Sequence, residues 1–198
     1  SMFPMGGILY NEKGETSIKG LYACGMETFI DLSGSAIFGH FTGENAAKYA
    51  KEAKLPSMER VKAKVKEKQP LLAELRHREV GADWKEVNIT LQQIMNDHAG
   101  AVRSGSMLEA GLTYLRRLKD KAYGTMMARN QHELGRCLEV LNLFDLGELV
   151  FITSLERKET RGTFIRTDYP ITNPLLDRLL IARRVDERPV FDYRKIKR

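Results

Sequence analysis

The sequence predicts an α+β fold that is mostly α-helical. Glycines punctuate short apolar segments near the start of the chain, and three later stretches repeat apolar residues every three or four positions. We therefore expect a short β-hairpin with one helix over residues 1–55 and a charged helical linker over 56–82. A three-helix antiparallel bundle over 83–160 and an extended basic tail over 161–198 complete the expected fold.

The first segment predicts the hairpin. A glycine pair precedes an apolar strand at residues 7–10, the turn Asn11–Gly14 reverses the chain, and a second strand follows at residues 20–24. Asparagine and glycine favour such turns, because both tolerate the backbone angles that a reversal requires.

The next segment predicts a helix from about Ser33 to Ala53. Ser33 or Ser35 can cap it by accepting a hydrogen bond from a first-turn amide. Gly39 and Gly43 lie four residues apart on one face, so that face can pack closely against a sheet or another helix.

The linker is expected to be helical in part. Ser57 can cap a charged helix over residues 58–68, and Gln69-Pro70 then interrupts or kinks it before a further turn or two at 71–77.

Apolar residues at helical spacing predict the bundle. The first helix starts at Trp84, the second follows Ser104–Ser106, and the third spans about 128–159, with a looser pattern and a kink at 145–147. Stripes of this kind form a core far more often than a cofactor site, so we assign them no chemistry. The stripe residues are Trp84, Val87, Leu91, Ile94, Met95, Met107, Leu108, Leu112, Leu115, Leu118, Leu134, Cys137, Leu138, Leu141, Phe144, Leu149 and Ile152.

The net charge of +6 is concentrated in residues 51–68 and 183–198. Both stretches also contain acidic residues, so a solvated helix face or a protein-docking surface is favoured over nucleic-acid binding. No apolar run approaches the ~20 residues of a membrane-spanning helix. Cys24 and Cys137 lack metal-type spacing and indicate reduced thiols in a cytoplasmic protein. His77, His98 and His132 have no companion ligands, so no metal site is expected.

Four ordered motifs carry a family resemblance. Gly-Gly-Ile at residues 6–8, a Lys-Gly-Glu turn at 13–15, GLYACG at 20–25 and SGSAIFGHFTGENAAKYA at 33–50 occur in succession. This order resembles the second FAD-binding segment of the succinate dehydrogenase/fumarate reductase flavoproteins, whose relatives include L-aspartate oxidase and the adenylylsulfate reductase flavoprotein. The resemblance implies an oxidoreductase with FAD as cofactor.

The resemblance also implies which residues contact FAD. Glycine backbone and Glu27 would face the ribityl-diphosphate side, although Glu27 stands one position later than the family's usual Gly-Glu. The amides of the first helical turn would face the flavin's pyrimidine edge, where the helix dipole favours negative charge. The expected cofactor-binding residues are Gly6, Gly7, Gly25, Glu27, Ser33, Gly34, Ser35 and Ala36.

A second motif extends the resemblance to the carboxy-terminal part of the family. Residues 159–170 read ETRGTFIRTDYP, where the family usually has Glu-Ser-Arg-Gly, three variable residues, Arg, one more, Asp, an aromatic residue and Pro. Arg161 and Arg166 can bind a carboxylate or phosphate, or they can pair with Glu156, Glu159 and Asp168 to lock the end of the long helix. We favour the second interpretation.

His40 lies inside the helix of small residues. We expect a hydrogen-bonded packing histidine there rather than a general acid.

The departures from the family pattern bear on substrate. The segment 28–32 lacks the arginine of the dicarboxylate-processing members, and residues 1–3 lack their histidine, so succinate or fumarate chemistry is unsupported. No Gly-x-Gly-x-x-Gly fingerprint is present. We therefore expect a carboxy-terminal piece of a larger FAD-dependent oxidoreductase, inactive alone and unable to retain FAD.

The expected partners are the missing amino-terminal FAD and capping domains and an iron–sulfur electron-transfer subunit. The alternative is a non-catalytic helical interaction module with a vestigial flavin segment.

Overall fold

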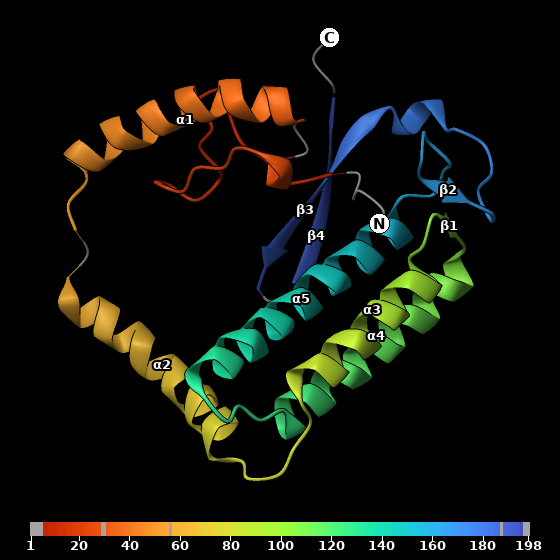
Figure 1. Ribbon diagram of the computed structural model, residues 1–198. Coiled ribbons are helices and arrows are strands. Elements are labelled where there is room, and N and C mark those ends of the chain that lie inside the picture. The colour runs from red at the N-terminus through yellow and green to blue at the C-terminus, as the bar shows by residue number, and fades with distance from the viewer. Residues whose placement is uncertain (1–5, 29–30, 56, 187, 196–198) are drawn as a thin grey trace. The chain divides into compact units, whose positions relative to one another are not determined.

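A computed structural model describes residues 6–28, 31–55, 57–186 and 188–195. The chain forms two compact units, Ser1–Arg60 and Val61–Arg198 (Figure 1).

The start of the first unit contains the predicted turn but not two regular strands. The Gly14 amide donates to the Asn11 carbonyl at 2.9 Å, which closes the turn. Isolated bridges then pair Tyr10 with Thr16 and Glu15 with Tyr22, so the expected ladder between 7–10 and 20–24 is wrong. The chain reverses twice because Gly14 (φ 78°) and a glycine at position 20 (φ 82°) both adopt positive φ.

The helix of the first unit, α1 (Leu32–Glu52), follows a short 3₁₀ helix η1 (Met26–Thr28). Its cap is Asp31, whose Oδ1 accepts a hydrogen bond from the Gly34 amide at 2.6 Å. The expectation of a cap at Ser33 or Ser35 is therefore wrong. Asp31 has the extended backbone of an N-cap, which places its carboxylate over the first-turn amides and puts Ser33 inside the helix.

Four helices dominate the second unit: α2 (Met58–His77, which begins in the first unit), α3 (Trp84–His98), α4 (Gly105–Thr125) and α5 (Gln131–Glu156). The last three pack pairwise against one another, as the apolar periodicity predicts (Figure 1). The core they share includes Val87, Leu91, Leu108, Leu115, Val140, Leu141, Phe144 and Phe151.

Two expected breaks do not interrupt their helices. Pro70 lies inside α2, where the surrounding residues are exposed and water can solvate the carbonyl that loses its partner. Gly147 lies inside α5 because the helices approach closely there. A Cβ at this position would lie 2.7 Å from Leu115 Cδ1 and 3.1 Å from Met95 Sδ. The loose apolar pattern at 145–147 thus marks close packing.

The tail contains more regular structure than the sequence indicates. A strand over residues 190–193 is present within β4 (Arg188–Lys195), and it pairs antiparallel with β3 (Arg178–Val185), which was not predicted. The register places Leu180 opposite Tyr193 and Ala182 opposite Phe191. These four side chains are partly buried on one face of the hairpin, which explains why the two strands associate.

Three short elements connect the bundle to the tail. Strand β1 (Val102–Arg103) pairs in parallel with β2 (Ile165–Arg166), and the 3₁₀ helix η2 (Pro174–Leu176) precedes β3. Among the helices that the structure describes, none is long and apolar enough to cross a membrane.

Candidate functional site

The glycine loop of the first unit closes around Glu27. The Ile8 amide donates to the Glu27 carbonyl at 2.7 Å, and a Cβ at Gly7 would collide with that same carbonyl. The Glu27 carboxylate accepts a hydrogen bond from the Cys24 amide at 3.1 Å. Gly25 has φ 121°, and a Cβ there would lie 2.9 Å from the carboxylate. Glycine is therefore required at both positions for the loop to close.

The loop contacts the amino-terminal part of α1. The Cys24 thiol donates to the Ser35 carbonyl at 3.6 Å, and a Cβ at Gly39 would lie 3.8 Å from the same sulfur. This contact brings the predicted loop residues and the predicted helix residues into one region of the unit. Gly6, with φ 148°, has open space around its Cα, and Ser33 and Ala36 are exposed.

Asp31 accepts hydrogen bonds from two of the four predicted first-turn amides. The amides of Gly34 and Ser35 both donate to Asp31, to its side chain and its carbonyl respectively. A ligand would have to displace Asp31 to reach the Gly34 amide. The sequence departs from the family pattern at two segments that the structure does not fully describe. Phe29-Ile30 and the residues before Gly6 lie outside the described residues.

His40 is exposed in the first unit. Its side chain is 73% exposed and its Nε2 lies 3.3 Å from Glu44 Oε1, one helical turn away. Whether His40 packs against further chain stays a prediction.

In the second unit, Arg166 is a deeply buried charged side chain of the motif at 159–170. It is 2% exposed, and it donates from Nε and Nη2 to the two oxygens of Asp168 at 2.8 and 2.7 Å. Its Nη1 donates to the carbonyls of Ser154 and Arg157 at the end of α5. The guanidinium thus joins the motif to the last turn of the long helix.

Asp168 extends this connection to α4. Its Oδ2 also accepts a hydrogen bond from the Gly105 amide, the first residue of that helix, at 2.9 Å. The hydrogen bonds from Arg166, together with the Gly105 amide, lower the pKa of Asp168 from 3.8 to about 2. The carboxylate therefore stays ionised throughout the neutral range.

Glu159 forms a second buried ion pair in the same motif. Arg161 donates to both of its oxygens at 2.9 and 3.1 Å, and Arg157 donates to one at 2.7 Å. The Asn173 amide adds a bond at 2.9 Å. Burial alone would raise the pKa of Glu159, but these partners outweigh it and the pKa is lowered. Arg161 also reaches Asp177 at 3.1 Å, so it ties the motif to the start of the tail.

The expected pairs with Glu159 and Asp168 are thus present, whereas Glu156 accepts a hydrogen bond from the Tyr193 hydroxyl at 3.4 Å. These ion pairs and hydrogen bonds hold α4, α5 and the tail together. The contacts of Arg161 and Arg166 are intramolecular.

One member of this cluster was missed. Arg103 donates to the Gly100 carbonyl at 2.7 Å and to the Ser154 hydroxyl at 2.8 Å, and its guanidinium lies 5.1 Å from the ring centre of Phe164. Burial and the nearby Arg166 lower the pKa of Arg103. Only its position just before the Ser104–Ser106 cap distinguishes it in the sequence, and that signal does not reveal contacts across the fold.

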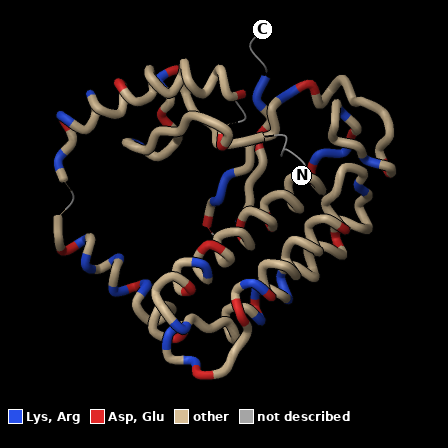
Figure 2. The backbone as a smooth tube through the Cα atoms, viewed as in Figure 1, with Lys and Arg blue, Asp and Glu red and all other residues tan. Residues whose placement is uncertain are grey.

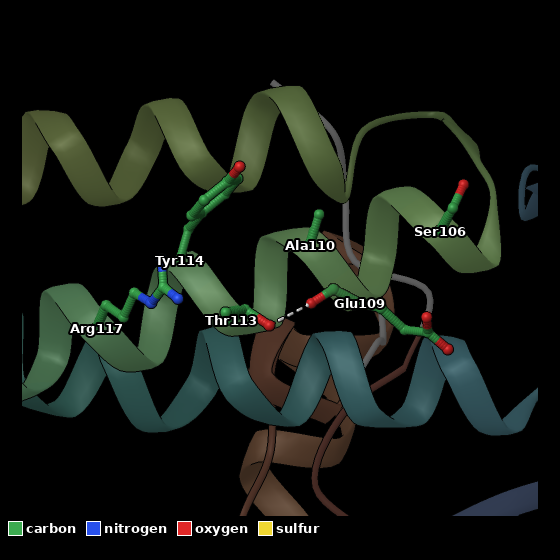
Figure 3. A pocket seen from close by; sticks show the side chains of 6 residues that line it. All are labelled: Ser106, Glu109, Ala110, Thr113, Tyr114 and Arg117. Carbon is green, nitrogen blue, oxygen red and sulfur yellow. Dashed lines mark hydrogen bonds between the residues drawn. The ribbon is translucent and has the colours of Figure 1, made fainter.

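Two shallow hollows lie on the second unit. One, of about 400 Å³, follows the outer face of α4 and is lined by Ser106, Glu109, Ala110, Thr113, Tyr114 and Arg117 (Figure 3). The other, of about 430 Å³, is bordered by Lys158 and residues 168–174. In the part of the chain that the structure describes, no group of three or more His, Cys, Asp or Glu side chains could hold a metal ion.

Comparison with known proteins agrees with the motifs. Residues 88–197 match the family model described as fumarate reductase flavoprotein C-term. The fumarate reductase flavoprotein subunit of Helicobacter pylori is 29% identical over 184 residues, covering 85% of this chain and 26% of that protein. The L-aspartate oxidase of Yersinia pestis is 26% identical over 194 residues, covering 87% of this chain and 33% of that protein.

Solved structures share the fold. A quinol-fumarate reductase with menaquinol molecules superposes with a TM-score of 0.83 at 20% identity, over 96% of this chain and 36% of that one. The adenylylsulfate reductase of Archaeoglobus fulgidus superposes with a TM-score of 0.79 at 22% identity, covering 92% of this chain and 33% of that one. This chain spans about a quarter to a third of the length of these proteins. It belongs to the succinate dehydrogenase/fumarate reductase flavoprotein family and contains that family's carboxy-terminal region.

Proposed function

We propose that the chain acts as the carboxy-terminal part of an FAD-dependent oxidoreductase. In this proposal the first unit supplies one side of the flavin site, and the rest of a longer flavoprotein supplies the dinucleotide fingerprint. The single observation that carries the proposal is the junction at Cys24 and Ser35, which brings the glycine loop against the start of α1.

The residues at this junction fit a flavin nucleotide. Gly6 and Gly25 present backbone without a side chain, so a ligand can approach closely. The exposed Ser33 lies at the positive end of the α1 dipole, where an electron-rich edge is favoured. FAD, when bound, supplies the two-electron chemistry of the family. The chain's own groups would orient it and favour negative charge near the start of α1.

The surface of α1 supports a role within a larger flavin domain. Ile37, Phe38 and Phe41 are 59%, 51% and 56% exposed, although they are large apolar side chains. Ala23 and Thr42 are among the few buried residues of the first unit. So small a core buries little apolar area, and additional chain packed on α1 would stabilise it.

We further propose that residues 1–55, 56–82, 83–160 and 161–198 act as flavin segment, linker, bundle and tail. The bundle and tail would dock an electron-carrying partner, such as an iron–sulfur subunit. The basic residues of the β3–β4 hairpin, among them Arg183, Arg188 and Arg194, support this docking. The free thiols of Cys24 and Cys137 support a reducing compartment such as the cytoplasm.

The flavin role is tested in a longer polypeptide that joins this chain to the amino-terminal FAD domain that the proposal requires, purified with and without Gly25→Val. A branched side chain at φ 121° would distort the loop and collide with Glu27, so the variant should carry at most about a tenth of the flavin per polypeptide. Gly124→Ala in α4, where a Cβ meets no atom within 4 Å, is the control and should keep its flavin. Unchanged flavin content in Gly25→Val would refute the role of the loop.

A further inference from the structure

The amino-terminal half of α2 stands free of the bundle. Every side chain from Val61 to Pro70 is exposed, although the helix is regular throughout this stretch. Figure 2 shows that basic residues recur along it. The other end of the helix is firmly held, since Leu75 is fully buried and its carbonyl accepts the Ala128 amide at 2.7 Å. Arg78 adds a hydrogen bond to the Met126 carbonyl at 2.7 Å.

The sequence explains where the helix leaves the bundle. Leu71 and Leu75 pack on the core from one face of α2. Seven residues earlier on the same face, two turns of helix away, stand Lys64 and Lys68. Burying either ammonium group without a partner would be costly, so the contact with the bundle ends at Leu71.

The free half has an ordered surface. Val61, Val65 and Leu72 form one apolar stripe, being four and seven residues apart, and the two valines are 39% and 53% exposed. Lys62 lies beside the stripe on one side and Lys64 on the other, while Lys68, seven residues after Val61, lies in line with it. Lys66 lies toward the opposite face. The nearby acidic residue Glu67 lies toward the opposite face, where it pairs with Lys64 at 2.7 Å.

We propose that this face, the α2 basic face (Val61, Lys62, Lys64, Val65, Lys68 and Leu72), docks an acidic helix of a partner protein. An apolar ridge flanked by Asp or Glu on both sides would match the valines and the lysines that surround them. The helix is already formed and anchored at Leu75, so binding orders little further backbone. The inference goes beyond the proposed flavin role and does not depend on it.

Charge and apolar area argue against other occupants. A second copy packed α2 against α2 would place lysine opposite lysine, which is repulsive. An anionic bilayer could attract the lysines, but helices that lie on membranes insert Trp, Phe or Leu, whereas this stripe offers two valines and one partly buried leucine.

The test uses the 198-residue chain and a labelled, designed helical peptide that carries a leucine ridge flanked by glutamates. Fluorescence anisotropy should show saturable binding that weakens as salt is raised. A peptide with lysines in place of the glutamates should bind at least about tenfold more weakly. Lys62→Glu/Lys68→Glu should weaken binding of the acidic peptide by about tenfold or more. All substituted positions are exposed, and circular dichroism verifies that α2 remains helical.

The control variant is Lys121→Glu/Lys158→Glu, which makes the same change of charge at exposed positions outside the α2 basic face. It should bind the acidic peptide within about twofold of the unsubstituted chain. Equal losses in the two variants, or equal binding of both peptides, would overturn the proposal. So would absence of peptide binding, whether or not vesicles of phosphatidylcholine and phosphatidylserine capture the chain through the same lysines.

Discussion

The two carboxylate oxygens of Asp168 accept hydrogen bonds from Nε and Nη2 of Arg166, at 2.8 and 2.7 Å. One of these oxygens, Oδ2, also accepts a hydrogen bond from the Gly105 amide at 2.9 Å. One side chain thereby joins the motif at 159–170 to the first turn of α4. Arg166 is nearly fully buried and also donates to the end of α5. Asp168 therefore neutralises the buried guanidinium that links two bundle helices to the tail.

Removing this carboxylate should destabilise the bundle. Asp168→Ala leaves the buried Arg166 without its ionic partner, and we expect a loss of about 2–4 kcal/mol, less than for a fully buried pair because Asp168 is 34% exposed. Urea unfolding followed by circular dichroism measures the change. Asp192→Ala removes a partner of Arg183 from an exposed pair at 3.7 Å and should cost less than about 1 kcal/mol. Equal losses of unfolding free energy in the two variants would contradict a stabilising role for the Arg166–Asp168 pair.

The same pair should make stability depend on pH in acid. The pKa of Asp168 is lowered to about 2, chiefly by the hydrogen bonds from Arg166, whereas the unfolded chain has the ordinary value near 3.8. A lowered pKa in the folded state adds stability above the unfolded pKa, and this stability is lost as the pH falls toward 2. The Tm difference between the unsubstituted chain and Asp168→Asn should be constant above about pH 5 and shrink between about pH 4 and 2. A difference that stays constant down to pH 2 would contradict this assignment.

Glycine at position 111 should be required for close packing of α4. A Cβ there would lie 2.6 Å from a ring carbon of Phe151 and would also meet His98. Gly111→Ala should cost about 1–3 kcal/mol through overpacking, although alanine favours helices. Gly124→Ala, in the same helix with open space around it, should be neutral or stabilise by up to about 1 kcal/mol. Thermal unfolding measures the stability of both variants. Stabilisation by Gly111→Ala would show that α4 has more space at this position than the distances to Phe151 and His98 indicate.

Asp31 rather than Ser33 should cap α1. Asp31→Ala removes the acceptor for the Gly34 amide and should weaken the start of the helix by about 1 kcal/mol. Amide hydrogen exchange over residues 32–37 should accelerate about fivefold, because that free energy governs local opening. Ser33→Ala should leave exchange nearly unchanged. The opposite ranking would restore the serine as the cap.

The bundle could be predicted from the sequence because its core residues repeat at helical spacing, a local signal that packing only reinforces. Val87 and Leu91 on α3, and Leu108 and Leu115 on α4, are all buried where the stripes place them. The cap of α1 was missed because three polar residues within five positions compete for it, and local pattern does not rank them. Strand β3 was missed because its apolar run precedes two arginines, and only pairing with Phe191 and Tyr193 makes it a strand.

The same distinction applies to the candidate sites, where local features could be predicted and contacts between distant segments could not. Glycine punctuation predicted the loop, and the contact between Cys24 and Ser35 joins it to α1. The link between Arg103 and Ser154 spans distant segments and left no periodic signal in the sequence. Such contacts depend on how β1 and β2 are brought together, which a single sequence does not reveal.

We propose that the chain supplies part of a flavin site and needs further sequence to complete it. An FAD titration, followed by flavin fluorescence, compares the folded 198-residue chain with a longer polypeptide in which it is joined to the amino-terminal FAD domain that the proposal requires. We expect one FAD per longer polypeptide and no saturable binding by the 198-residue chain. Saturable one-to-one binding by the short chain, or a longer polypeptide that binds no flavin, would contradict it.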